Sequence, residues 1–177
     1  GAAFMLDLAP DTPLHITLLG ALRLVWGQTP LSLPRTAAAR SLLAYLVLHH
    51  GQALPRNLLA GTFWPERPDA ESRKALSDAL WQIRQCLGLA ATRLAVGRDA
   101  VTFTLQEEDS LDVAEFTARL RHCRERFRGT PLPAAALSTG LAELNAAVAC
   151  YRADLLPDCY DDWTLPVRER LREEYLW

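Results

Sequence analysis

Charged and hydrogen-bonding side chains recur between residues 71 and 85 at a spacing that places them on one side of a helix. At about 100° per residue, one stripe of this segment is apolar and the opposite stripe is polar. Polar side chains on a helix can read base edges in the major groove of DNA, and cations can reach phosphates. The residues with these properties are Arg73, Lys74, Ser77, Asp78, Trp81, Arg84 and Gln85.

Two members of this stripe fit a DNA-facing surface less easily. Trp81 is a large aromatic side chain at its centre, and two interpretations of it are open. Either it packs on sugars or thymine methyl groups in the groove, or another part of the chain or a second copy covers it. Asp78 would repel phosphates unless it accepts from cytosine or braces an arginine. The alternative for the whole segment is an ordinary amphipathic helix with a solvated polar face.

Short strand-like runs lie before and after this segment. Those before it predict a small antiparallel sheet, and those after it predict a hairpin with Arg98 at its turn. The first group is residues 15–19, 22–26 and 31–33, and the hairpin strands are 92–96 and 100–105.

Three helices are predicted between the sheet and the hairpin. Thr36 caps the first, which runs to about His50; the second runs from Pro55 to Phe63 with Leu58 facing inward; and Asp69 caps the third, which ends at Gly88. A small antiparallel sheet, three helices and a C-terminal hairpin predict an α+β winged helix-turn-helix over residues 14–106. Residues 1–13 are expected to form an N-terminal tail.

The second half of the chain differs in charge and in pattern. Residues 1–105 contain ten Lys or Arg against seven Asp or Glu, a net charge of +3, whereas residues 106–177 contain nine against fourteen, a net charge of −5. The acidic stretch 107–109 separates them, so we predict a boundary near residue 110. The second domain, residues 110–177, is expected to be all-α, with helix pairs that resemble tetratricopeptide (TPR) repeats.

The helices of this second domain are predicted from apolar stripes. Asp112 and Glu115 form a capping box, and two stripes with helical spacing follow. The first stripe is Val113, Phe116, Leu120, Cys123 and Phe127, and the second is Leu137, Leu141, Leu144, Val148 and Tyr151. A last helix starts near Trp163 and reaches the end of the chain, so we expect a truncated domain in which self-association as a homodimer could cover the apolar faces.

We find no motif for catalysis. The sequence has no metalloprotease, P-loop, nucleophile-elbow or dinucleotide-binding motif, and its four cysteines lack zinc-ligand spacing. We therefore expect neither an enzyme, nor a cofactor, nor a metal site. No apolar run is long enough to span a membrane and no secretory signal is evident, so the expected location is the cytoplasm.

Several segments, in order, resemble SARP-type bacterial activators, a branch of the OmpR-type winged helices. In the first half these are 16–20, 22–24, 33–35, 41–46, 63–65 and 75–84. In the second half 111–116, 151–156, 161–163 and 168–171 resemble the bacterial transcriptional activator domain that follows in this family. The resemblance covers about residues 14–177.

The resemblance implies a DNA-binding transcriptional activator. In this family the third helix enters the major groove, the hairpin is the wing, and pairs of protomers occupy direct repeats in double-stranded promoter DNA. By position, Arg93 and Arg98 fall on the wing, and we expect Arg35 and Arg56 to contact DNA as well. The loop before the third helix would face RNA polymerase; it consists of Trp64, Pro65, Glu66, Arg67 and Pro68.

A second function remains open. The modest charge of +3 on the first domain and the atypical Trp81 are compatible with a protein-binding scaffold whose winged helix no longer binds DNA. Enrichment of bound sequences from random duplexes would distinguish the two.

Overall fold

A computed structural model describes residues 11–129 and 133–176 and divides the chain into two compact units. Of the described residues, the first unit comprises 11–15 and 23–109, and the second comprises 16–22, 110–129 and 133–176. Most of the predicted N-terminal tail, residues 1–13, lies outside the described residues. Sequence analysis assigned residues 16–22 to the first domain, whereas the structure groups them with the second unit.

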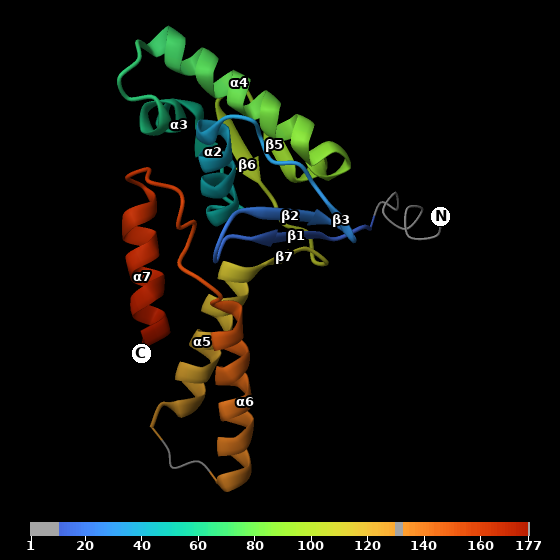
Figure 1. The fold of residues 1–177 in the computed structure, drawn as a ribbon, viewed down its shortest axis with the longest axis vertical. Helices are drawn as coiled ribbons and strands as arrows, with labels where there is room; N and C mark the ends of the chain where they lie inside the picture. The colour runs from blue at the N-terminus through green and yellow to red at the C-terminus, as the bar shows by residue number, and fades with distance from the viewer. Residues whose placement is uncertain (1–10, 130–132, 177) are drawn as a thin grey trace. The chain divides into compact units, whose positions relative to one another are not determined.

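The described residues form two small sheets (Figure 1). The first has the strand order β3-β2-β1-β7, and the second has the order β4-β6-β5. Their strands are β1 (Leu14–Thr17), β2 (Arg23–Trp26), β3 (Thr29–Pro30), β4 (Leu54–Pro55), β5 (Leu94–Val96), β6 (Ala100–Phe103) and β7 (Ser110–Leu111).

The strand predicted at residues 31–33 is wrong. Gly27, at a φ of 63°, turns the chain so that Trp26 pairs with Thr29 and Val25 pairs with Pro30 in antiparallel register. Because glycine adopts a positive φ without strain, a two-residue turn is possible here. The strand β3 therefore begins at Thr29, earlier in the chain than predicted. The amide of Leu31 still donates to the carbonyl of Leu24, at 2.9 Å.

Among its described residues, the first unit has the three predicted α-helices and one short 3₁₀ helix. These are α2 (Ala37–Leu48), α3 (Arg56–Phe63), α4 (Asp69–Leu87) and the 3₁₀ helix at Gly88–Arg93. Thr36 caps α2 as predicted, because its hydroxyl accepts from the amide of Ala39. Asp69, however, is the first residue of α4 and not its cap, and Leu58 is 48% exposed where an inward position was predicted.

The core of this unit lies between its helices and the β4-β6-β5 sheet. Leu42 and Leu46 of α2, Leu59 of α3, Ile83 of α4 and Phe103 of β6 are all fully buried or nearly so. Figure 1 shows α2 and α3 on one side of α4, so that α4 forms an outer edge of the unit. One face of α4 therefore packs on the core and the other remains open.

The second unit contains α5 (Asp112–Phe127), α6 (Ala134–Cys150) and α7 (Thr164–Leu176). Helices α5 and α6 pack against each other. Asp112 does not form the predicted capping box. Its carboxylate accepts from the amides of Leu18, Leu19 and Val113 at 2.8–2.9 Å, which ties residues 18–19 to the start of α5.

The side of α6 that packs differs from the predicted one. Its buried residues are Gly140 and Ala147, whereas Leu137, Leu141 and Val148 are exposed. A side chain at position 140 would collide with the ring of Phe127, so α6 approaches α5 through small residues. The predicted stripe on α5 is correct for Val113, Phe116, Leu120 and Cys123, but Phe127 is partly exposed.

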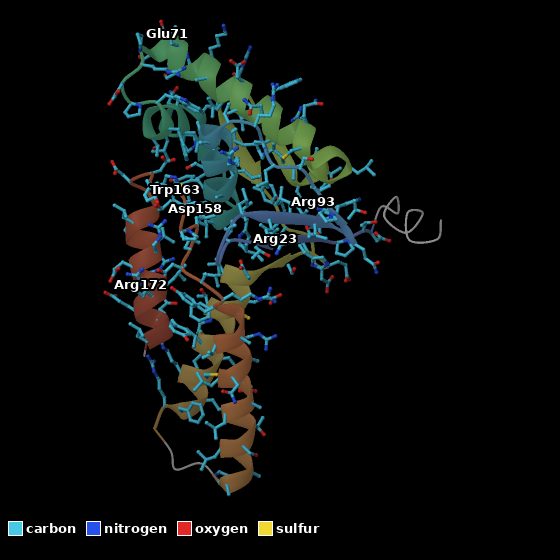
Figure 2. The ribbon with its side chains drawn as sticks, viewed as in Figure 1. Arg23, Glu71, Arg93, Asp158, Trp163 and Arg172 are labelled. Atoms are coloured by element: carbon cyan, nitrogen blue, oxygen red, sulfur yellow. The ribbon has the colours of Figure 1, made fainter. Side chains whose placement is uncertain are left out.

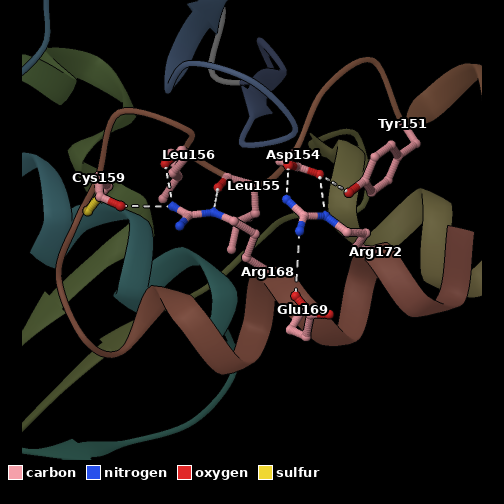
Figure 3. Close-up of polar contacts among 8 residues, drawn as sticks. All are labelled: Tyr151, Asp154, Leu155, Leu156, Cys159, Arg168, Glu169 and Arg172. Carbon is pink, nitrogen blue, oxygen red and sulfur yellow. Dashed lines mark hydrogen bonds and ion pairs between the residues drawn. The ribbon is translucent and has the colours of Figure 1, made fainter.

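Arginines of α7 hold the segment between α6 and α7 (Figure 3). The guanidinium of Arg168 donates to the carbonyls of Leu155, Leu156 and Cys159 at 2.7–2.8 Å. Arg172 pairs with Asp154, which also accepts from the hydroxyl of Tyr151. The amide of Leu156 in turn donates to the carbonyl of Leu18, so this segment packs on residues 16–22.

In the described part of the chain, no helix combines the length and the apolar character that crossing a membrane requires.

Candidate nucleic-acid interface

The open face of α4 carries the seven polar and aromatic residues that the sequence singled out. The apolar residues Leu76, Leu80 and Ile83 of the same helix are buried against the core. The seven residues of the open face are exposed: Arg73, Lys74, Ser77, Asp78, Trp81, Arg84 and Gln85. The structure therefore brings these predicted residues together on one surface, which we call the α4 face.

The α4 face carries three cations, Arg73, Lys74 and Arg84. Among the residues that the structure describes, no carboxylate oxygen lies within 4.0 Å of a charged nitrogen of Arg73, Lys74 or Arg84. Their charges are thus available to an anionic partner, and phosphates are the partners that such clusters commonly neutralise. The two carboxylates on this side of the helix are Asp78 and Glu71, and Figure 2 shows Glu71 near the start of α4.

Arg56 joins the α4 face to the hairpin of β5 and β6. Its Nη2 donates to Oγ of Ser77 at 2.9 Å, and its Nη1 lies 3.4 Å from the carbonyl oxygen of Gly97 in the hairpin turn. Its own amide donates to the carbonyl of Asp99, at 2.9 Å. The exposed Arg98 sits in this same turn, so the turn and the middle of α4 are held on one surface.

A groove of about 360 Å³ runs along the other flank of Trp81. It is lined by Leu33, Pro34, Arg35, Trp81, Gln82, Gln85 and Cys86. Arg40 fixes the loop that carries Arg35, because its Nη1 donates to the carbonyls of Pro34 and Arg35 at 2.9 Å. The predicted contact residue Arg35 is therefore exposed beside Trp81.

Gln82 connects this loop to α4. Its side-chain oxygen accepts from both the amide and the hydroxyl of Thr36, each at 3.2 Å. The thiol of Cys86 is chemically quiet, because burial raises its pKa to about 11 and it donates to the carbonyl of Ile83. Hydrogen bonds thus connect the two walls of the groove, and its thiol is unreactive.

Arg93 does not belong to this surface, so the prediction that it contacts DNA is wrong. The residue is 3% exposed, and its guanidinium forms two hydrogen bonds of 3.0 Å to the enclosed carboxylate of Asp109. It also donates to the carbonyl of Thr12 and lies over the ring of Trp26, 4.9 Å from the centroid. Figure 2 shows Arg93 inside the unit, away from the start of α4. Its cation stabilises the core and is not available to phosphates.

The loop expected to face RNA polymerase forms one wall of a second hollow. Trp64 ends α3, and residues 65–68 are exposed before α4 begins. A cavity of about 440 Å³ lies between this loop and the first turn of α4, with Asn57 on its α3 side and Arg67 and Arg73 among its lining residues. The loop is therefore accessible, and its lining is polar.

Sequence reasoning missed the residues that position the interface. Gln82, Thr36 and Arg40 were not predicted to support it. The contact between Thr36 and Gln82 joins residues 46 positions apart, whereas Arg40 acts locally, on the carbonyls of Pro34 and Arg35. The sequence did predict that Thr36 caps α2, which locates its hydroxyl. It did not predict the second contact of that hydroxyl, with Gln82.

The chain was compared with protein families, curated proteins and solved structures. No family model matches the chain, and no curated protein matches it. The fold is similar to that of EmbR. The solved structure of Mycobacterium tuberculosis EmbR in complex with a low-affinity phosphopeptide matches with a TM-score of 0.74 and 23% identity. The match covers 94% of this chain and 43% of the EmbR chain.

At this identity the likeness establishes the fold alone. It supports the SARP-like fold inferred from the sequence, whereas membership of the family stays a prediction. The chain spans less than half of the EmbR chain, so the match covers only part of that protein.

Proposed function

We propose that the chain is a sequence-specific DNA-binding transcriptional activator with a winged-helix first domain and a TPR-like second domain. In this proposal α4 enters the major groove, and the hairpin of β5 and β6 acts as the wing. The observation that carries the proposal is the α4 face itself. Three cations, which have no carboxylate partner among the described residues, lie on an exposed helix whose middle is tied to the hairpin turn through Arg56 and Ser77.

The arrangement fits the requirements of a duplex. A major groove about 12 Å wide admits one helix, and the groups on either side of that helix then lie near the two phosphate strands. Arg56 and Arg98 flank the α4 face on the hairpin side, and Arg35 flanks it on the groove side. The likeness to EmbR supports the fold on which this geometry depends.

Further features of the proposal concern partners. Two protomers would occupy direct repeats in promoter DNA, as the family resemblance implies. The exposed loop of residues 64–68 would face RNA polymerase, and its polar hollow offers Arg67 to an acidic side chain.

A protein-binding scaffold is the second candidate. The observation in its favour is the exposed stripe on α6, formed by Leu137, Leu141 and Val148. Exposed apolar stripes of this kind often mark protein contacts. This candidate does not account for the unpaired cations of the α4 face, so we rank it second.

Selection from a pool of random duplexes tests the proposal. We expect enrichment of a repeated half-site, with repeats about one helical turn apart. Lys74→Ala and Arg84→Ala should each weaken binding by about 1–3 kcal/mol. Arg23→Ala is the matched control, because Arg23 is exposed on β2, away from α4 (Figure 2). Equal, weak and salt-sensitive binding to every duplex would favour the scaffold instead.

A further inference from the structure

Trp81 occupies the centre of the α4 face. It is 58% exposed, although large aromatic side chains are usually covered in a free protein. At about 100° per residue, Lys74, Ser77 and Gln85 lie within roughly 40° of Trp81 around the helix, and Asp78 and Arg84 lie about 60° away. Trp81 therefore points outward near the middle of the α4 face.

The charges on the two flanks of Trp81 come from different elements. On one flank Ser77 binds Arg56, which reaches the hairpin turn that carries Arg98. On the other flank the groove brings Arg35 beside the indole. Cations thus bracket the indole on both sides.

This bracketing decides what a docked duplex would present to Trp81. If the flanking cations lie over the two phosphate strands, the central side chain faces the floor of the major groove and not the backbone. An indole offers one N–H donor, and the rest of its edge is apolar. The apolar group that distinguishes a base pair in the major groove is the C5 methyl of thymine.

A protein covering Trp81 would have to meet the same charges. It would bury or approach Arg73, Lys74 and Arg84, which have no carboxylate partners among the described residues, and would have to supply several acidic groups at once. A duplex supplies anions along both flanks without that requirement.

We infer that Trp81 is a specificity-determining residue that packs against the methyl group of a thymine in each half-site. The inference rests on the proposed DNA-binding function and adds the identity of a base to it. Trp81 contributes through contact with one methyl group, so its loss should relax the preference at one position and leave the other positions of the half-site unchanged.

The test replaces each thymine of the selected half-site, one at a time, by deoxyuridine, which lacks only the methyl group. The wild-type chain should bind one such duplex roughly fourfold more weakly, the amount expected for one buried carbon group. Trp81→Ala and Trp81→Gln should bind the thymine and deoxyuridine duplexes equally. Leu58→Ala is the matched control, because Leu58 is an exposed apolar residue on α3, and it should retain the fourfold difference.

The outcomes separate the inference from the proposal beneath it. A selected half-site at which the wild-type chain tolerates every deoxyuridine would overturn the inference and leave DNA recognition standing. A methyl effect that persists in Trp81→Ala would also overturn it, because another residue would then contact the methyl. No enriched half-site would reject the proposed function and the inference together. Thermal unfolding of both Trp81 variants, expected to match the wild type, excludes misfolding as the cause.

Discussion

Arg56 donates from Nη2 to Oγ of Ser77 at 2.9 Å, which joins the first residue of α3 to the middle of α4. The same guanidinium approaches the carbonyl of Gly97 in the hairpin turn. One cation thus fixes the spacing between a helix and a hairpin that would both meet the duplex. Because no carboxylate among the described residues pairs with Arg56, it also retains its charge for a phosphate.

Arg56→Ala should weaken binding to all duplexes while the sequence preference is kept. The plot of log affinity against log salt concentration should become shallower by about one unit, because one phosphate contact is lost. Ser77→Ala keeps the charge of Arg56 but removes the hydroxyl that accepts its hydrogen bond. It should therefore change the salt dependence less than Arg56→Ala does. Fluorescence anisotropy at several salt concentrations measures both, with Arg23→Ala as control. An unchanged slope in Arg56→Ala would show that Arg56 has only a structural role.

The pairing of Arg93 with Asp109 predicts acid sensitivity of the first unit. Burial alone would raise the pKa of Asp109, but the hydrogen bonds from Arg93 and from the amides of Leu14 and Gln106, together with the charge of Arg93, hold it below its ordinary value of 3.8. A carboxylate with a lowered pKa stabilises the fold above the unfolded value, and this stability is lost as the pH falls through the lowered pKa. The wild type should therefore lose stability below about pH 4.

Two substitutions test this pair. Arg93→Ala leaves a buried carboxylate without its cation and should lower the free energy of unfolding by about 3–5 kcal/mol at pH 7. Asp109→Asn should be less stable than the wild type at pH 7, and its stability should depend less on pH between 5 and 3. Chemical denaturation across this range provides the measurement. Parallel pH profiles for Asp109→Asn and the wild type would contradict the assignment.

The carboxylate of Asp112 predicts a local opening when it is removed. In Asp112→Ala the amides of Leu18 and Leu19 lose their acceptor, at a cost of about 1–3 kcal/mol for each buried group left unpaired. Their hydrogen exchange should accelerate, while that of the Leu14 amide, held by Asp109, should not change. Glu115→Ala is the control, since a true capping box would depend on Glu115. If Glu115→Ala and Asp112→Ala behaved alike, the capping box would be correct after all.

The packing of α6 predicts that substitutions at its small buried residues destabilise the fold more than substitutions at its leucines. Leu141→Gln should change the free energy of unfolding by less than about 0.5 kcal/mol, because this leucine is exposed. Ala147→Leu should destabilise by about 1–3 kcal/mol, because it adds volume where α6 meets its neighbours. Thermal unfolding of the two variants gives the comparison. The reverse order of effects would restore the stripe that the sequence predicted.

Contacts between nearby residues could be predicted from the sequence. Thr36 as a cap, Gly88 as the end of α4, and the hairpin around Arg98 all depend on backbone preferences within a few residues. The α4 face was predictable for the same reason, since its residues share one helix and the 3.6-residue period alone places them together.

The features that the sequence did not predict depend on partners distant in sequence or on the size of side chains where two helices meet. Arg93 lies beside the hairpin, and a basic residue at this place predicts a contact to DNA. In the structure it donates instead to the carboxylate of Asp109, 16 residues further along the chain. The position of Asp112 predicts a helix-capping residue. Its carboxylate instead accepts two hydrogen bonds from amides that lie more than 90 residues away in the sequence. On α6, periodicity favours burying the leucines, whereas close approach to α5 favours glycine and alanine.

Residues 16–22 have a consequence for any attempt to study the two units separately. This heptapeptide carries Ile16, Leu18, Leu19 and Leu22, all buried, and it is grouped with a unit whose remaining residues begin at Ser110. An expression clone that stops after Asp109 would display these four apolar side chains without their partners. A clone that starts at Ser110 would leave Asp112 without two of its amide donors. Separating the chain between Asp109 and Ser110 would thus leave both fragments incomplete. Joining residues 16–22 to the front of Ser110 through a linker would restore the second unit.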